Sequence, residues 1–178
     1  MALLPIVYYG DRILRKAGKR IDPTDLKESA SIKKLAHDMI ETMRENNGIG
    51  LAAQQVNRLE RIIMIDVSSF DENAEPFALI NPEIVKVGKE KVVIQEGCLS
   101  FPDLYLDIER PALVTVAALD IEGNPMTLEA DGILARALQH EIDHMKGTLF
   151  IDYIHPLKRK FLLKKWQVSS NARKKSDG

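Results

Sequence analysis

The spacing of apolar side chains predicts helices at three places in the chain. Apolar residues recur every three or four positions over residues 26–45, and the Asn-Asn-Gly that follows is a helix stop. A second helix is predicted over 131–147, with Asp131 as its cap and a glycine at its end. A third follows Pro156, with apolar side chains on one side and lysines on the other. These three segments are the expected helical part of the fold.

Short runs rich in β-branched and aromatic residues lie between the first and second of these helices. They occupy residues 61–67, 77–87, 91–94, 112–120 and 126–130. The last two flank the turn sequence Glu-Gly-Asn-Pro, which predicts a hairpin. Consecutive strands that do not alternate with helices favour an α+β fold over a doubly wound sheet. We therefore expect mainly antiparallel sheets packed around a central helix, with an additional C-terminal helix.

The amino-acid composition is ordinary for a soluble globular protein. With 45% apolar and 29% charged residues and no linker or repeat, the chain is expected to form a single domain over residues 1–168. Residues 169–178 are expected to be a flexible basic tail. One cysteine excludes an internal disulfide framework, and no apolar run approaches the ~18 residues that span a bilayer. The expected location is cytoplasmic, with no membrane partner.

Charge is unevenly distributed along the chain. The formal net charge of -1 excludes a globally basic nucleic-acid-binding protein. Residues 158–178, however, hold eight basic side chains and one acidic one, so this segment carries about +7 and the rest of the chain about -8. The C-terminal helix is therefore a candidate cationic surface on an acidic body.

The strongest chemical motif is His-Glu-Ile-Asp-His at 140–144, in the central helix. Residues i and i+4 share one helix face, so His140 and His144 can bind one metal ion. Glu141 lies beside them and can take a proton from water on that metal. The alternative is a helix with two ordinary hydrogen-bonded histidines, but both lie on the expected apolar face, where unpaired imidazoles are costly. Asp143 is expected to be an exposed surface charge.

A catalytic zinc-type site usually has three protein ligands, so one more is needed. Cys98, the one cysteine, follows a predicted strand and can supply it as a thiolate, with Glu96 anchoring its loop. A lone cysteine is by itself more often a small buried apolar residue. One thiolate with two imidazoles suits Fe(II), Zn(II), Ni(II) or Co(II).

A third motif, Gly-Ile-Gly-Leu-Ala-Ala-Gln-Gln, occupies residues 48–55. Its small residues allow the backbone to approach a strand or a ligand closely. It lacks the Gly-Lys-Ser/Thr ending and the preceding strand of a phosphate loop. On its own, a tight turn with solvated glutamines is the simpler interpretation.

Taken together and in this order, segments 48–55, 96–100 and 139–144 resemble the three motifs of the bacterial peptide deformylase family. The family patterns are G-φ-G-φ-A-A-x-Q, E-G-C-φ-S and H-E-x-x-H, where φ is apolar, and all three match completely. The likeness covers about residues 5–165, and three ordered motifs are far more specific than one.

The resemblance implies hydrolysis of the N-formyl group from the N-terminal formyl-methionine of newly made polypeptides, with release of formate. It implies Cys98, His140 and His144 as metal ligands and Glu141 as the residue that moves the proton. The implied cofactor is one divalent metal ion, Fe(II) in cells, with Zn(II), Ni(II) or Co(II) as substitutes.

Further roles follow from the same resemblance. The Gln55 side chain and the Leu99 backbone N–H resemble the family's oxyanion hole. The candidate substrate-binding residues are an apolar slot for methionine at Ile49, Ile133 and Ala137, and strand edges for the peptide backbone at Ile49, Gly50 and Gly97. Tyr105 stands where some members have an arginine near the substrate's backbone.

Two other functions compete with this interpretation. One is a metallopeptidase of the His-Glu-x-x-His type, for which His155 is the available third ligand, although a chain reversal and a proline flank it. The other is a metal-stabilised, ribosome-associated binding module without catalysis, against which Glu141 and Gln55 both count. A substrate at the ribosome also makes the basic C-terminal helix a candidate docking element, the alternative being a solvated helix end.

Overall fold

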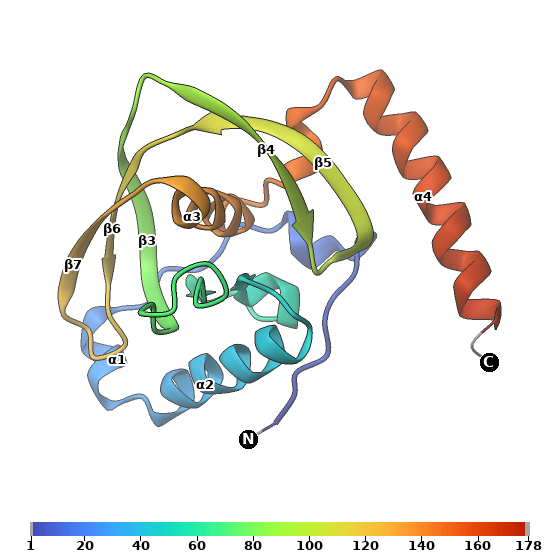
Figure 1. The fold of residues 1–178 in the computed structure, drawn as a ribbon. Coiled ribbons are helices and arrows are strands. Elements are labelled where there is room, and N and C mark those ends of the chain that lie inside the picture. The colour runs from blue at the N-terminus through green and yellow to red at the C-terminus, as the bar shows by residue number, and fades with distance from the viewer. Residues whose placement is uncertain (1, 177–178) are drawn as a thin grey trace.

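Helix α3 (Gly132–Met145) lies at the centre of the molecule, between a five-stranded and a two-stranded sheet (Figure 1). The computed structural model describes residues 2–176, and the side chains of all of these except 27, 28 and 168–176. Every strand pair in both sheets is antiparallel. The predicted α+β fold with antiparallel sheets around a central helix is confirmed.

The larger sheet has the order β1-β2-β3-β6-β7. Its strands are β1 (Gly50–Ala52), β2 (Ile62–Ile65), β3 (Phe77–Val87), β6 (Val114–Leu119) and β7 (Pro125–Ala130). All four residues of β2 are buried because both faces of the strand are covered. Ile63 and Ile65 pack with apolar side chains of α3, and Ile62 and Met64 pack with those of α2 (Ala30–Glu45). This two-sided burial explains the continuous apolar run in the sequence.

The smaller sheet is a hairpin of β4 (Lys91–Cys98) and β5 (Phe101–Pro111). Strand β5 was not predicted, because acidic residues and prolines interrupt its apolar positions. Its burial nevertheless alternates, with Leu104, Leu106, Ile108 and Arg110 facing inward. The hairpin carries Cys98 at its tip, so it brings the candidate thiolate toward α3.

The first predicted helix is two helices. α1 (Pro23–Glu28) and α2 are separated by Ser29, whose extended backbone breaks the helix and whose hydroxyl accepts from the N–H of Ile32 at 3.3 Å. Asp131 precedes α3 as expected, but its side chain makes no capping hydrogen bond.

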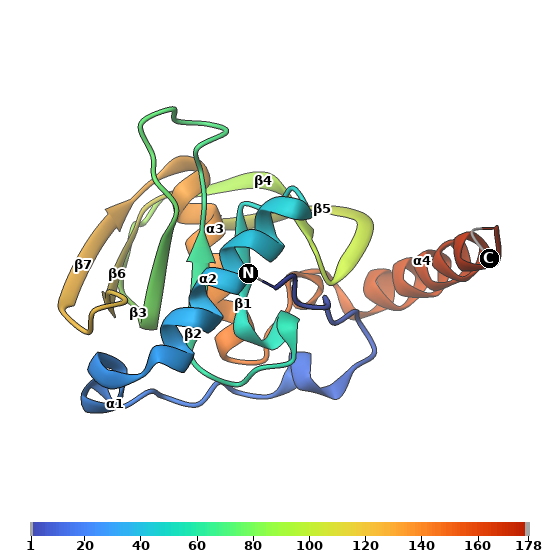
Figure 2. The same ribbon diagram turned by 90° about the horizontal axis from the view of Figure 1, so that it is seen from below.

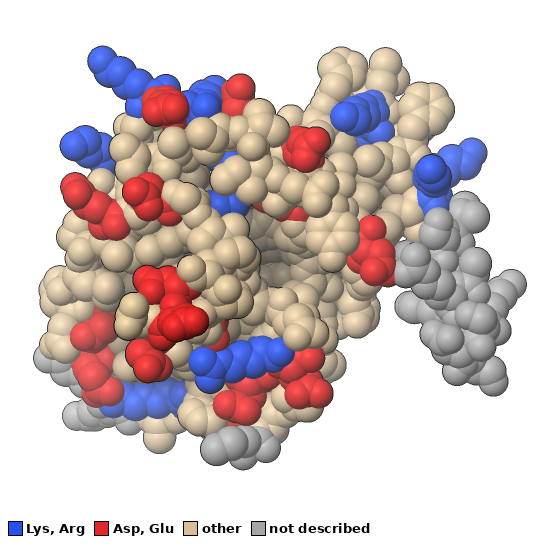
Figure 3. Space-filling model, viewed as in Figure 1, with Lys and Arg blue, Asp and Glu red and all other residues tan. Residues whose placement is uncertain are grey.

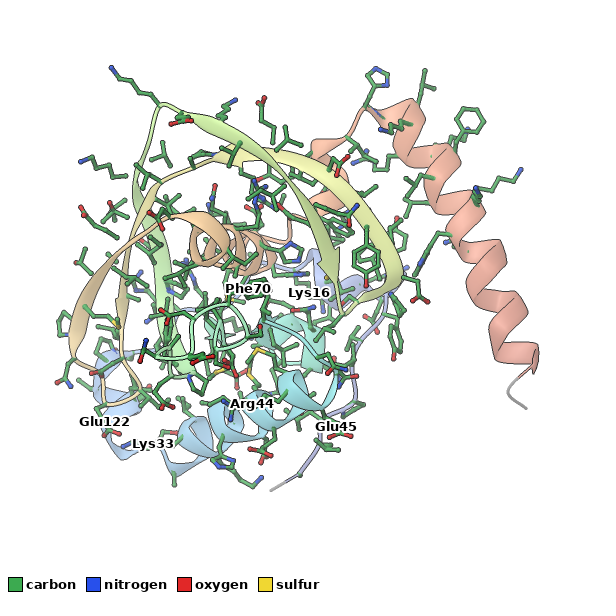
Figure 4. All side chains as sticks on the ribbon, viewed as in Figure 1. Lys16, Lys33, Arg44, Glu45, Phe70 and Glu122 are labelled. Carbon is green, nitrogen blue, oxygen red and sulfur yellow. The ribbon has the colours of Figure 1, made fainter. Side chains whose placement is uncertain are left out.

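Figure 4 shows Lys33 of α2 directed toward Glu122 in the β6–β7 turn, and their charged atoms lie 2.5 Å apart.

Helix α4 (Pro156–Ser176) leaves the body of the molecule and projects from it in both views (Figures 1 and 2). Leu162, Leu163 and Trp166 seat its first turns on a cluster that includes Phe101 and Phe150. Residues 169–176 belong to α4 and residues 177–178 lie outside the described part; the flexibility expected for 169–178 stays a prediction. Among the described helices, none has the length and apolar character to cross a bilayer.

Candidate active site

Three side chains from two elements form the candidate metal site. Cys98 ends β4, and His140 and His144 lie one turn apart on α3. Their ligand atoms all lie within 4.8 Å of one another, and Cys98 Sγ is 3.4 Å from His144 Nε2. One thiolate and two imidazoles are a donor set that fits a single divalent transition metal. Among the described residues, this is the group of His, Cys and acidic side chains that could hold a metal ion.

Glu96 fixes the orientation of the first histidine. Its carboxylate lies 2.8 Å from His140 Nδ1, so the ring donates there and its Nε2 remains available as a ligand. Burial alone would raise the pKa of Glu96, but hydrogen bonds from His140 and Arg110 outweigh it and lower the pKa to about 2. Glu96 is therefore a charged acceptor for a ligand histidine, in addition to lying next to the Cys98 loop.

Two arginines hold Glu96 from the other side. Arg110 donates to both carboxylate oxygens at 2.6 and 3.0 Å, and Arg136 donates to one of them at 2.7 Å. Arg136 also donates to the carbonyls of Ile108 and Val92, both at 2.8 Å. Because Arg136 belongs to α3 and the carbonyls belong to β5 and β4, this side chain ties the hairpin that carries Cys98 to the helix that carries the histidines.

The expectation that Asp143 is an exposed surface charge was wrong. It is only 8% exposed, and its carboxylate accepts from Arg110 at 2.6 Å and from the Tyr153 hydroxyl at 2.7 Å. The guanidinium of Arg110 also lies over the Tyr153 ring, 4.4 Å from its centroid. A buried arginine needs a second acidic partner once Glu96 is shared with Arg136, and Asp143 supplies it.

Glu141 projects into the space beside the metal-binding residues. It is 4% exposed, and burial raises its pKa to about 7. Its Oε2 atom is buried without a hydrogen-bond partner among the described residues. A Cβ added to Gly50 would lie 2.8 Å from Glu141 Cγ, so the glycine is what allows β1 to approach this carboxylate.

The Gln55 amide is held in one orientation. Its oxygen accepts from the backbone N–H of Ala52 at 2.8 Å, so its Nε2 must face the other way. That nitrogen lies 3.4 Å from Cys98 Sγ and 3.3 Å from Ser100 Oγ. The arrangement aims an N–H donor at the space between Cys98 and the cavity.

A cavity of about 610 Å³ opens beside these groups. Figure 3 shows a hollow at the centre of this face of the molecule. Its lining includes every residue predicted to bind substrate, together with Gln55, Leu99 and Glu141; the substrate set is Ile49, Gly50, Gly97, Tyr105, Ile133 and Ala137. The Tyr105 ring covers Gly97, where an added Cβ would lie 2.7 Å from a ring carbon. The structure thus brings the predicted residues to one place, while their roles remain predictions.

Sequence reasoning missed the ion network behind the ligands. Arg110, Arg136 and Tyr153 were not singled out, although Arg110 occupies an inward position of a strand whose burial alternates from Leu104 onward. That position was the available signal. His155, the alternative third ligand for a metallopeptidase, is exposed and lies outside the ligand cluster.

Comparisons with a family model, with individual proteins and with solved structures all identify the same family. The polypeptide deformylase family matches residues 3–160. Proteins named peptide deformylase are similar over nearly the whole chain, at 42% identity in Rhizobium meliloti (97% of this chain and 97% of the relative) and 47% in Chromohalobacter salexigens (97% and 98%). The crystal structure of peptide deformylase from Ehrlichia chaffeensis superposes with a TM-score of 0.87 at 39% identity, covering 97% of this chain and 99% of that one.

Proposed function

The chain belongs to the polypeptide deformylase family and is a metal-dependent hydrolase that removes the N-formyl group from nascent peptides, and from this premise we propose a role for each residue of the site. The observation that supports these roles best is the meeting of Cys98, His140 and His144 beside the buried Glu141 at one cavity.

Cys98, His140 and His144 would hold the metal ion. When bound there, a divalent ion lowers the pKa of water toward ~7 and acts as a Lewis acid toward the formyl carbonyl. Glu96 keeps the His140 ring in the tautomer that leaves Nε2 unprotonated. We propose Fe(II) as the metal in cells, with Zn(II), Ni(II) or Co(II) as substitutes. A site of one thiolate and two imidazoles suits transition-metal ions of this group.

Glu141 is the proposed proton carrier. A carboxylate whose pKa lies near 7 can both accept and release a proton at the pH of a cell. We expect Glu141 Oε2 to take the proton from the attacking water and to deliver it to the departing amine. The absence of a partner for this atom among the described residues leaves it available for that exchange.

Gln55 and Leu99 are the proposed donors to the oxygen that gains negative charge. The Gln55 Nε2 is already directed toward the site because its oxygen is occupied by Ala52. The Leu99 N–H follows Cys98 in the tight turn between β4 and β5. Removal of one such donor typically raises the barrier by ~2.7–4 kcal/mol.

The substrate would occupy the 610 Å³ cavity. Ile49, Ile133 and Ala137 give it an apolar wall suited to a methionine side chain. The edges of β1 at Gly50 and of β4 at Gly97 can pair with a peptide backbone, which selects extended chains without reading their sequence. Tyr105, over Gly97, is a candidate contact at the same edge.

We also propose that α4 docks on the ribosome. Its lysines Lys158, Lys160 and Lys164 are exposed, and Figure 3 shows basic side chains on the first part of the helix, away from the hollow. Such a surface is attracted to RNA phosphates, and the attraction weakens with salt. Replacing these three lysines with glutamate should lower ribosome affinity at low salt; unchanged affinity would identify α4 as a solvated helix end. A cytoplasmic location, where the thiolate stays reduced, agrees with this role.

The decisive experiment is formate release from a formyl-methionyl peptide by protein purified without oxygen, with metal analysis of the same sample. Glu141→Gln should retain the metal and lose formate release. Glu109→Gln is the matched control, because Glu109 is exposed on β5 and pairs with Lys91. Full turnover by Glu141→Gln would refute the proton-carrier role, and cleavage of blocked internal peptides would favour a metallopeptidase.

A further inference from the structure

Phe101, Pro102 and Asp103 form a stretch of the cavity lining that we call the rim. Helix α4 contacts this rim through Trp166, the single tryptophan of the chain. The indole Nε1 donates to the carbonyl of Pro102 at 2.7 Å. The ring centroid lies 5.5 Å from that of Phe101 and 6.2 Å from that of Tyr9. Because Phe101 and Pro102 both line the cavity, one side chain of α4 contacts two consecutive residues of the substrate site.

These rim residues follow directly after the turn that carries the catalytic groups. Cys98 and Phe101 are paired across that turn, and the turn is fixed by a hydrogen bond of 2.9 Å from the Tyr9 N–H to the Ser100 carbonyl. The Trp166 bond acts two residues further on, at Pro102. The turn therefore has its own support, and Trp166 supports the rim beyond it.

The rim has an unusual backbone at the point where Trp166 holds it. Asp103, next to Pro102 and part of the cavity lining, has φ of 60°, the left-handed region that residues other than glycine rarely adopt. Such a conformation persists where surrounding contacts impose it. A hydrogen bond to the preceding carbonyl is a contact of that kind.

The packing of Trp166 also extends inward. Phe101 contacts Phe150 edge-on, with centroids 5.2 Å apart, and Phe150 lies 5.7 Å from the His140 ring. His140 is separately fixed by Glu96, so this ring series reaches the metal site without being its main support. The effect of Trp166 should therefore fall on the rim more than on the metal ligands.

We propose that Trp166 is a positioning residue for the substrate: it holds the Phe101–Pro102–Asp103 rim, so that the affinity for peptide depends on the seating of α4. This inference rests on the proposed function, because it takes the cavity as the peptide site. It also has a reciprocal consequence, since a peptide that binds against the rim must alter the environment of Trp166.

The first test is the kinetics of Trp166→Phe, which keeps an aromatic ring and removes the N–H donor. KM for a formyl-methionyl tripeptide should rise about 2- to 10-fold, the range given by one net hydrogen bond fully coupled to binding. kcat should stay within about twofold and the bound metal should be unchanged. The control is Phe161→Ala on the same helix, a side chain that is 72% exposed, and its KM should equal that of the unaltered protein.

The second test uses the unaltered protein, so it does not depend on a variant folding. Titration with the deformylated product peptide Met-Ala-Ser should change the emission of the single tryptophan. The change should saturate at the concentration at which the same peptide inhibits formate release. If Trp166 only anchors α4 and is not coupled to peptide binding, the emission of this half-buried tryptophan should stay constant during the titration.

The outcomes separate this inference from the function on which it rests. Absence of formate release by the unaltered protein would overturn the proposed function. Two results with an active protein would overturn the role of Trp166 alone. One is a folded Trp166→Phe variant with the KM of the unaltered protein; the other is tryptophan emission that does not change when the product binds. An equal rise in KM for Phe161→Ala would also overturn it, because the effect would then belong to α4 in general.

Discussion

Replacement of Gly50 with alanine should slow catalysis strongly and leave the protein folded. In the structure, β1 passes so close to α3 that a Cβ on Gly50 would overlap the Glu141 carboxylate. It would lie 2.8 Å from Cγ and 2.9 Å from Cδ, and it would meet Oε1 most closely. Carbon atoms in contact are normally ~3.5–4.0 Å apart, so the carboxylate has to move by about 1 Å.

The two consequences of that movement are similar in free energy, but the rate falls by the whole factor, whereas a fold with a typical stability of ~5–15 kcal/mol stays folded. A displacement of about 1 Å in a reacting group can lower a rate ~10²-fold, which corresponds to ~2.7 kcal/mol in the barrier. The cost to the fold is that of one extra methyl group in a packed region, ~1–3 kcal/mol. The atoms displaced are the far end of a side chain rather than backbone, so the strand pairing of Gly50 with Ile65 can persist.

The assay is kcat for formate release, measured with the free energy of unfolding in urea and the metal content of the same preparation. We expect Gly50→Ala to lose about 100-fold in kcat, to bind metal normally and to remain folded. Gly88→Ala is the control, because a Cβ added there is also crowded, at 3.0 Å from the Leu113 Cβ. Gly88 lies between β3 and β4, outside the cavity lining. It should lose no activity.

A double variant identifies the cause of the loss. If Gly50 acts through Glu141, then Gly50→Ala combined with Glu141→Gln should be no slower than Glu141→Gln alone. A further 100-fold loss in the double variant would refute the reasoning, because Gly50 would then act independently, for instance on the peptide backbone. Normal turnover by Gly50→Ala would refute it as well.

Three further predictions concern the buried charges, the metal and acid stability. Arg110→Met leaves Glu96 and Asp143 without their shared partner and should lower the free energy of unfolding in urea by ~3–5 kcal/mol, whereas Lys91→Met at an exposed pair should change it by less than ~1 kcal/mol. Removal of metal with a chelator should abolish formate release and lower the melting temperature, and Co(II) should restore both; activity that survives complete removal contradicts metal dependence. Burial opposes ionisation of Asp152, but its arginine partners and a backbone N–H hold its pKa below the usual value. The ionised Asp152 therefore stabilises the fold above pH ~4, the pKa range of an unfolded aspartate. This stabilisation is lost as the pH falls through the lower pKa of the folded state. The difference in melting temperature between the unaltered protein and Asp152→Asn should therefore shrink from pH 6 to pH 3; a constant difference contradicts it.

Local pattern was enough to predict the helical segments, most strands and the histidine pair, whereas Cys98 joined the ligand set through the resemblance of three ordered motifs to a known family. The period of α3 and the i, i+4 spacing of its histidines are properties of one helix, so sequence alone places both imidazoles on one face. The α1–α2 break was missed because Ser29 fits the helical period and interrupts the helix only through its backbone conformation. β5 was missed because three of its outward positions are acidic, prolines stand near both of its ends, and its inward positions end in an arginine.

The supporting charges could not be predicted because each of them depends on a distant partner. Asp143 has the sequence context of a solvated helix residue, and it is buried only because β5 and Tyr153 bring an arginine and a hydroxyl to it. Arg136 is likewise an ordinary helix residue until β4 and β5 present two carbonyls and Glu96. Tertiary pairing of this kind leaves no periodic signal in the sequence.

The charges of this network balance, and the balance has a consequence that can be measured. Two arginines, Arg110 and Arg136, face two carboxylates, Glu96 and Asp143, so the cluster is neutral and can hold His140 without adding charge at the metal. Loss of Arg110 alone leaves one buried negative charge in excess, and loss of Asp143 alone leaves one positive charge. Loss of both leaves Arg136 paired with Glu96, which is neutral again. Arg110→Met combined with Asp143→Leu should therefore be more stable in urea than Arg110→Met alone. If the double variant were the less stable of the two, packing rather than charge balance would be what the network contributes.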